Sequence, residues 1–189
     1  MVFRALILAA VLGGAQAAER EGVKLDDRIQ VDGQALELNG MGLRTRMFFK
    51  VYVAGLYLPQ KASDAQRAIE GGGAKRIVLV MMRDATADQF CESIQAGMER
   101  NSTPAEIERV RAQTETLFSR IRAVGEARAG MRIVLDYAPS ATATLLFVDG
   151  VAQGGPMPGE DFFRALLRIW LGENPGQPDL KRALLGGEL

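Results

Sequence analysis

The stretch NGMGLRTRMFFKVYVAGLYL, residues 39–58, predicts a pair of strands. Its second half is rich in aromatic and β-branched residues, a composition typical of a strand, and Pro59 follows it directly. We therefore expect a first strand that enters through Arg44, a turn near Thr45–Met47, and a second long strand that ends at Leu58. The two strands would form a hairpin.

Further strands are expected on both sides of this hairpin. Val23–Leu38 reads as short strand pieces broken at Asp32–Gly33, a dipeptide that favours turns. Lys75–Met82, KRIVLVMM, is a nearly continuous apolar run, which indicates a strand covered on both faces. Met131–Tyr137 and Thr142–Val148 add two more strands.

Helices are expected between and after these strands. Thr86–Gln89 and Thr103–Glu106 both fit capping boxes, in which a side chain at each end satisfies a backbone donor at the other. The second of these helices is amphipathic as far as Val124. The remaining helices are a short one from Ser63 to Gly71–Gly73, one over Phe162–Leu171 and one over Asp179–Leu185. The order of elements predicts an α+β fold with a mostly antiparallel sheet.

The N-terminus has the three-part pattern of a secretory signal peptide. It contains Arg4, the apolar run Ala5–Leu12 and the small-x-small pattern Ala15–Ala17. A membrane anchor or a buried N-terminal helix is the alternative, but a run of eight apolar residues falls far short of the roughly 20 that cross a bilayer. We predict cleavage near Ala17, a mature domain of residues 18–189, and a periplasmic or secreted location.

Composition narrows the chemistry that the chain can perform. Its 23 basic and 23 acidic side chains balance, so the total charge indicates neither a nucleic-acid nor an anionic-membrane partner. Histidine is absent, which removes the commonest general base and a common metal ligand. Cys91 is the only cysteine, so no intramolecular disulfide forms, and we expect it to be a small buried hydrophobe. We expect neither a metal nor a cofactor.

The Gly-x-Gly-x-Arg pattern at Gly40–Arg44 and the Gly-Leu-Tyr-Leu signature at Gly55–Leu58 resemble the chalcone-isomerase-like family, in its bacterial exported form. The likeness continues through Lys75–Met82 and returns at Phe162–Gly172 and Pro178–Gly186. It implies a large antiparallel sheet with a layer of helices packed on it. The ligand of such a fold lies in a cleft between the sheet and the helices.

The resemblance also implies roles for individual residues. In the plant isomerases an Arg and a Thr on paired strands polarise the substrate ketone, whereas in the plastid fatty-acid-binding members an Arg and a Tyr grip a carboxylate. Arg44 matches the arginine and Tyr52 stands at the second position, so the site resembles the fatty-acid binders. Phe90 and Gly97 stand where the isomerases carry a Tyr and an Asn, so two donors for an enolate-like oxygen are missing.

The residues by themselves leave plainer interpretations open. Arg44 could be a strand-edge arginine paired with a surface carboxylate. Tyr52 and Tyr57 could be ordinary half-buried strand aromatics. Lys50 and Arg46 are expected to face solvent. A further apolar set is expected to belong to the core, with the lining of an apolar channel as the alternative: Phe48, Phe49, Met81, Met82, Phe90 and Met98.

We expect non-catalytic binding of a small amphipathic carboxylate, such as a fatty acid, with Arg44, Tyr52 and Phe90 as ligand-binding residues. The alternative is an isomerase or lyase that acts on an enone-like molecule, with Arg44 as electrophile and Tyr52 as proton donor. A third interpretation is a collapsed cleft in a domain that binds another envelope protein. The pattern leaves the oligomeric state open.

Overall fold

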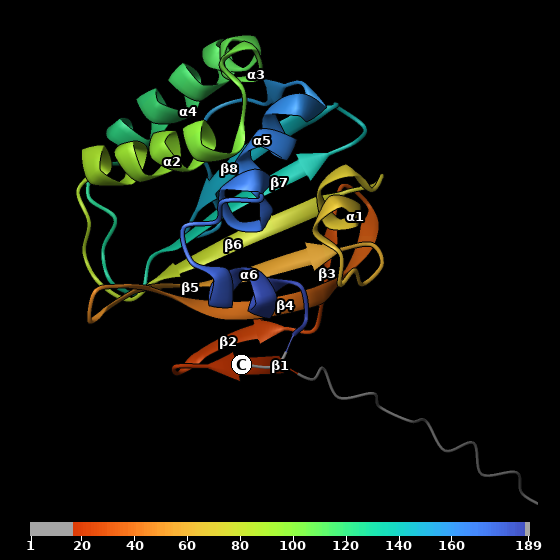
Figure 1. Cartoon of the computed structure of the whole chain (residues 1–189), viewed down its shortest axis with the longest axis vertical. Coiled ribbons are helices and arrows are strands. Elements are labelled where there is room, and N and C mark those ends of the chain that lie inside the picture. Colours follow the sequence, from red (N-terminus) through yellow and green to blue (C-terminus); the bar gives the residue numbers. More distant parts are fainter. Residues whose placement is uncertain (1–16, 188–189) are drawn as a thin grey trace, which may run out of the picture.

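The computed structural model describes residues 17–187, and these form a curled sheet, a set of helices and a small separate ribbon (Figure 1). The predicted signal peptide lies outside them apart from Ala17, which begins the first strand. The strands are β1 (Ala17–Arg20), β2 (Val23–Asp26), β3 (Arg28–Val31), β4 (Gln34–Arg46), β5 (Phe49–Leu58), β6 (Lys75–Met81), β7 (Arg132–Ala138), β8 (Ala143–Val148), β9 (Val151–Ala152) and β10 (Met157–Pro158). The helices are α1 (Ala65–Glu70), α2 (Ala87–Asn101), α3 (Pro104–Arg109), α4 (Arg111–Val124), α5 (Glu160–Leu171) and α6 (Pro178–Leu184).

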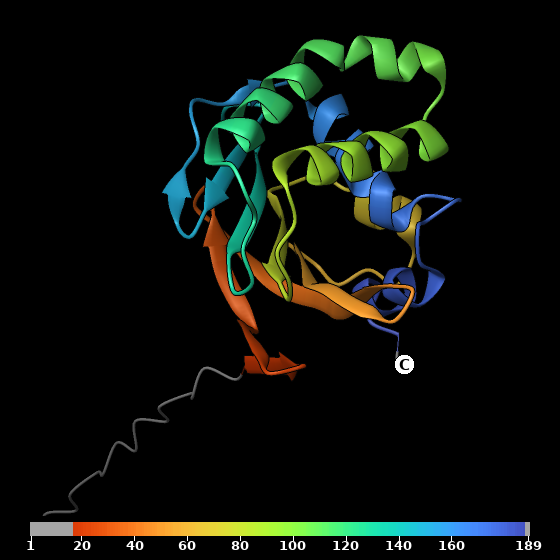
Figure 2. The ribbon, with the colours of Figure 1, turned by 90° about the vertical axis from the view of Figure 1, so that its left-hand side faces the viewer.

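The main sheet is antiparallel throughout, in the order β10-β8-β7-β6-β5-β4-β3, with β9 paired on β8. β1 and β2 form the separate ribbon. From β3 to β8 each strand pairs with the next one along the chain, and the helices are inserted between them or follow them. Figure 2 shows the sheet curling around one side of the helices. The predicted α+β fold, an antiparallel sheet with a helical layer, is confirmed.

Three local features differ from the sequence-based expectation. β4 runs as far as Arg46, so the hairpin turn lies at Met47–Phe48, slightly later than predicted. The amphipathic helix predicted up to Val124 is two helices, because the backbone leaves helical geometry at Val110 (φ −106°, ψ 11°). β1 and β10 were not expected, since strands this short show too little alternation to be recognised.

Both predicted capping boxes are confirmed, and the first of them fixes the start of a helix that borders the site. Thr86 Oγ1 accepts a hydrogen bond from the backbone N–H of Gln89 at 3.2 Å, and Gln89 Oε1 accepts one from the N–H of Thr86 at 3.1 Å. The reciprocal pair sets where α2 begins. The position of Phe90 on its first turn follows from that start.

The strand β6 is buried on both faces, as its continuous apolar run predicts. Ile77, Leu79 and Met81 face the large core between sheet and helices. Val78 and Val80 face a smaller core on the other side, which β1 to β3 cover. The curled sheet therefore separates two apolar layers, and the helix-side layer is the one that borders the site.

The helix α5 is the centre of the large core. Phe162, Phe163 and Leu166 on it are almost completely buried. Gly97 of α2 packs against this helix so closely that a Cβ there would lie 2.6 Å from Cγ2 of Ile169. Glycine at this position therefore serves helix packing. Like every helix within residues 17–187, α5 is not long and apolar enough to cross a membrane.

The helix α6 lies directly on β4, and glycines make this possible. A Cβ on Gly40 would overlap the carbonyl oxygen of Ala183, and one on Gly42 would lie 2.7 Å from the Ala183 side chain. Beside them, buried Asn39 donates from Nδ2 to the carbonyls of Ala62 and Leu184, at 3.0 and 2.7 Å. The Gly-x-Gly pattern before Arg44 therefore reflects helix docking.

Replacing Gly40 by alanine should destabilise the protein, because the new methyl group meets backbone atoms of α6 that cannot move aside independently. We expect a loss of roughly 1–3 kcal/mol in the free energy of unfolding, measured by urea denaturation. Gly72→Ala is the matched control, since a Cβ there meets no atom within 4 Å and its backbone is not left-handed. Equal stability of the two variants would contradict the proposed role of Gly40.

Candidate ligand-binding site

Arg44 on β4 and Tyr52 on β5 are direct partners in the antiparallel ladder. Residues paired in this way carry their side chains on the same face, next to each other. That face is the one covered by helices, because Tyr52 packs against the large core. Both residues line one cleft, while their contact with a ligand stays a prediction.

A cleft of about 700 Å³ opens beside this pair, between the β4–β5 hairpin, the loop of residues 82–86 and α2. Small-molecule sites commonly measure about 300–1,000 Å³, so the cleft is large enough for a ligand. The third interpretation of the sequence required a collapsed cleft, whereas this cleft is open. Its apolar lining comes mainly from Met47, Phe49, Val51, Met81 and Phe90. Its basic lining comes from four arginines, called the cleft arginines below: Arg44, Arg46, Arg83 and Arg100.

Within residues 17–187, none of the cleft arginines forms an ion pair with a carboxylate. Elsewhere arginines such as Arg28, Arg76 and Arg122 are paired. Asp84 and Glu92 also line the cleft, so its lining carries some negative charge. The lining is nevertheless more basic than acidic, and its positive charge is free to meet an anion.

Neutral acceptors hold the Arg44 side chain. Its Nη1 donates to the carbonyl oxygen of Gly176 at 2.7 Å and to Oε1 of Gln177 at 3.4 Å. Gln177 is itself tied to β4, because its Oε1 accepts from the N–H of Thr45 at 2.9 Å and its Nε2 donates to the carbonyl of Leu43 at 3.0 Å. The guanidinium is therefore oriented while its charge stays uncompensated. The surface ion pair considered for Arg44 is not found within the described chain.

Arg100 approaches Arg44 from the last turn of α2. A Cβ built on Gly176 would lie 3.1 Å from Nη2 of Arg44 and 3.4 Å from Nη2 of Arg100, so both guanidinium groups pack against Gly176 and lie near each other. Like charges at such a short separation repel each other. An anion placed between them would turn this repulsion into attraction.

Tyr52 is held by Trp170 of α5. The indole Nε1 of Trp170 donates to the Tyr52 hydroxyl oxygen at 2.9 Å. Because the oxygen accepts this bond, the hydroxyl hydrogen is left to donate, and no acceptor for it is found among residues 17–187. Burial raises the pKa of Tyr52, against the smaller opposite effects of the Trp170 hydrogen bond and Arg44. Tyr52 therefore stays protonated and can donate to a ligand oxygen.

Phe90 stands between the cleft and the interior. It lines the 700 Å³ cleft, an apolar cavity of about 30 Å³ behind it, and a further cavity of about 20 Å³. A volume of 30 Å³ is about the share of one molecule in liquid water, too small for an alkyl chain. Tyr52 and Trp170 line the same inner cavity. Phe90 is thus placed to control access to it, and its contact with a ligand stays a prediction.

The apolar residues of the site region fall into two groups. Met81 and Met98 are buried core residues, as expected, while Met82 is only partly buried. Phe48 and Phe49 are 96% and 56% exposed, so the expectation that they belong to the core is wrong. They lie at the tip of the β4–β5 hairpin, where Phe48 is left almost uncovered and Arg83 covers part of the Phe49 ring.

Three other residues have structural roles away from the cleft. Tyr57 lies on the opposite face of the sheet, where its hydroxyl donates to the Asp26 carbonyl at 2.9 Å and burial raises its pKa to about 12. Lys50 is exposed, as predicted, and pairs with Glu21. Cys91 is a small buried residue, as predicted, and burial raises the pKa of its thiol.

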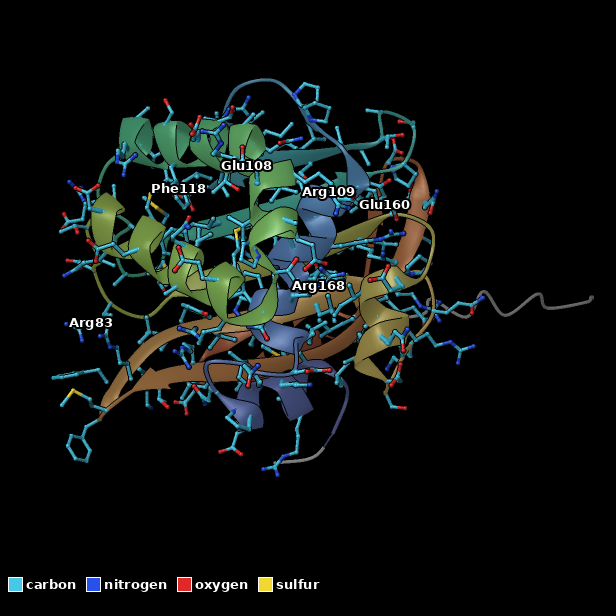
Figure 3. All side chains as sticks on the ribbon, turned by 45° about the horizontal axis from the view of Figure 1, so that its top comes forward. Arg83, Glu108, Arg109, Phe118, Glu160 and Arg168 are labelled. Atoms are coloured by element: carbon cyan, nitrogen blue, oxygen red, sulfur yellow. The ribbon has the colours of Figure 1, made fainter. Side chains whose placement is uncertain are left out.

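Arg83, Arg100 and Trp170 were not among the site residues expected from the sequence. Arg83 lies in the loop before α2, at the same end of the molecule as the β4–β5 turn (Figure 3). Trp170 offered a signal, because a buried indole N–H needs an acceptor. The two arginines offered none, since a charged side chain in a loop or at a helix end is ordinarily solvated.

The Tyr52–Trp170 bond can be measured with a double-mutant cycle of Tyr52→Phe, Trp170→Phe and the double variant. Each single change leaves a buried polar group without its partner, so the two should couple by about 1 kcal/mol in the free energy of unfolding. Urea denaturation followed by circular dichroism gives all four values. Strictly additive single changes would show that the bond contributes nothing to stability.

Comparisons with known proteins agree with this architecture. A search of curated proteins finds no match. Among solved structures, the chain is similar to a fatty-acid binding protein from Arabidopsis thaliana, with a TM-score of 0.70 and 14% sequence identity over 90% of this chain and 96% of that one. At this identity the likeness shows a shared fold. A model of the chalcone isomerase-like family matches residues 17–186, nearly the whole described chain. The chain therefore belongs to the chalcone isomerase-like family.

Proposed function

We propose that the protein binds a small amphipathic carboxylic acid, of the fatty-acid type, without transforming it, and that it does so in the periplasm. The observation that carries the proposal is the set of four cleft arginines, which form no ion pairs within residues 17–187 and border an apolar wall. A ligand that combines an anionic head with an apolar body matches both parts of this cleft.

The acid group would bind between Arg44, Arg100 and Tyr52. Arg44 and Arg100 converge from two elements, and a guanidinium offers a planar fork of donors that suits a carboxylate. Tyr52 adds a neutral donor beside them. Its raised pKa keeps the hydroxyl protonated at the pH where a carboxylic acid is ionised, so the two groups are complementary.

The apolar body would lie along the cleft wall of Phe49, Val51 and Met81, with Phe90 at its inner end. The cavity behind Phe90 holds only about 30 Å³, so a longer chain enters it only if Phe90 turns away. The lining of that cavity is almost entirely apolar, from the sheet on one side and α2, α4 and α5 on the other. The length of the fatty-acid chain that the protein can bind would then depend on how far the Phe90 side chain moves.

Two further observations support the proposal. The similar structure from Arabidopsis thaliana is described as a fatty-acid binding protein, and the family match covers the same fold. The periplasmic location rests on the signal-peptide pattern of Arg4, Ala5–Leu12 and Ala15–Ala17. Fractionation of cells, with the N-terminus of the recovered protein read by mass spectrometry, tests that part separately.

An isomerase or lyase that acts on an enone is the second candidate, because the protonated Tyr52 hydroxyl lies beside the positive charge of Arg44. Such a pair can polarise a carbonyl and donate a proton. Phe90 and Gly97 supply no further side-chain donor. A turnover assay with flavonoid and simpler enone substrates separates the two candidates, since a pure binding protein gives no acceleration over buffer.

Arg44→Ala and Arg100→Ala should each weaken binding of dodecanoate by about tenfold or more, because a charge-assisted hydrogen bond is lost. Isothermal titration calorimetry measures the affinity. Arg28→Ala is the matched control, as Arg28 is an exposed arginine on β3 that pairs with Glu37 and does not line the cleft. Unchanged affinity in both cleft variants, or equal affinity for dodecanol, would refute the assigned head-group site.

Phe90→Ala should let a fatty-acid chain reach the inner cavity. Trp170 is the only tryptophan and lines that cavity, so a fatty acid brominated at its chain end quenches its fluorescence on entry. We expect stronger quenching in Phe90→Ala than in the unmodified protein. Phe118→Ala is the control, because Phe118 lines a groove between α2 and α4 and lines neither the cleft nor the inner cavity. Equal quenching in all three proteins would mean that Phe90 does not separate the cleft from the cavity.

A further inference from the structure

The tip of the β4–β5 hairpin exposes three consecutive large apolar side chains to solvent. Met47, Phe48 and Phe49 are 82%, 96% and 56% exposed. Single exposed apolar residues are common on protein surfaces, but a contiguous group at a projecting turn is not. In the described chain, the one other large apolar residue with comparable exposure is Val151, which stands by itself on β9.

The residues at this turn are not the ones that hairpin turns usually contain. Met47 has a left-handed backbone, with φ of 56°. Glycine, asparagine or aspartate is the usual residue at such a position in a hairpin turn, because a larger side chain meets steric strain there. A methionine followed by a phenylalanine accepts this strain and exposes apolar surface as well. Other turns of the described chain also hold a left-handed residue other than glycine, such as Glu21 and Thr142, so the exposed apolar surface is the feature that indicates an interaction.

Positive charge surrounds the tip. Arg46 is exposed next to it, and the Arg83 guanidinium lies over the Phe49 ring at 4.5 Å from its centre. Neither arginine forms an ion pair within residues 17–187. Lys50 is paired with Glu21, and Asp84 Oδ1 accepts from the backbone of the opposite loop. The balanced total charge of the chain conceals this local excess.

We propose that the β4–β5 tip, residues 46–49, docks the protein on an anionic phospholipid surface. Met47 and Phe48 insert between the head groups, and Arg46 and Arg83 contact the phosphates. Apolar side chains flanked by arginine are the combination that binds at the boundary between head groups and acyl chains. The stacked Arg83 suits this position, because its charge points to the lipid phosphates while Phe49 shields its apolar face.

A bilayer fits the tip better than a protein partner does. A stable protein interface needs roughly 1,000 Å² or more of buried surface with shape complementarity. The tip is a projecting two-residue turn, which offers much less area. Lipid head groups part around a projection of this kind, and no matching cavity is needed.

Docking at the tip brings the cleft to the membrane. Met47, Phe49, Arg46 and Arg83 belong both to the tip region and to the cleft lining. An amphipathic acid could therefore pass between bilayer and cleft over a short path. The passage of an acid between bilayer and cleft rests on the proposed function. The docking itself does not, since vesicle binding is measured without added fatty acid.

Co-sedimentation with vesicles tests the proposal, using the protein as recovered from cells and its variants with the same N-terminus. Vesicles of phosphatidylethanolamine with phosphatidylglycerol supply the anionic surface, and phosphatidylcholine vesicles the neutral one. We expect binding to the anionic vesicles that falls as salt rises. Phe48→Ser should weaken it by about tenfold, and Arg46→Gln by about fivefold.

Val151→Ser is the matched control, because it also removes an exposed apolar side chain, and it should bind as the unmodified protein does. Insertion is measured directly with Phe48→Trp, whose emission should shift to the blue on anionic vesicles while buried Trp170 contributes a constant background. No binding to anionic vesicles, equal binding by Phe48→Ser, or an unshifted emission would each overturn the proposal. Loss of dodecanoate binding would leave it intact.

Discussion

The close approach of α6 to β4 is the constraint on which the site depends. Gly40 and Gly42 remove the side chains that would hold the helix away from the strand. The segment that enters α6 then reaches Arg44, where the Gly176 carbonyl and the Gln177 amide orient the guanidinium. Because neutral groups do this, Arg44 is fixed without losing its positive charge. The contact that docks α6 on β4 thus also orients the arginine that we propose for ligand binding.

A second fixed contact comes from α5. Trp170 donates to Tyr52 across the core, so the hydroxyl keeps one orientation and has its own hydrogen left to donate. The close packing of Gly97 on Ile169 brings α2 near α5, which narrows the interior to a small cavity behind Phe90. The volume available to a ligand therefore lies in the outer cleft, where the side chains are partly exposed.

The cleft and the hairpin tip depart from what stability alone would favour, and they do so next to each other. Four arginines line one cleft without carboxylate partners among the described residues, and apolar side chains project into solvent at the neighbouring turn. Arg76 and Arg122, by contrast, are paired with carboxylates, and most large apolar side chains of the described chain are buried. Departures of this kind concentrate at functional surfaces, because a ligand or a membrane supplies the missing contacts.

The sequence predicted most of the helices and strands, and the family resemblance identified Arg44 and Tyr52 as candidate site residues. The aromatic and β-branched composition of residues 43–58 and the capping box at Thr86 are local patterns, so both are readable from neighbouring residues. Register then placed Tyr52 beside Arg44. Two features emerge only in the folded chain: Trp170, 118 residues further along, orients Tyr52, and Phe48 stays uncovered. Contacts between distant segments, and the absence of a covering segment, depend on how the whole chain packs and leave no local pattern to read.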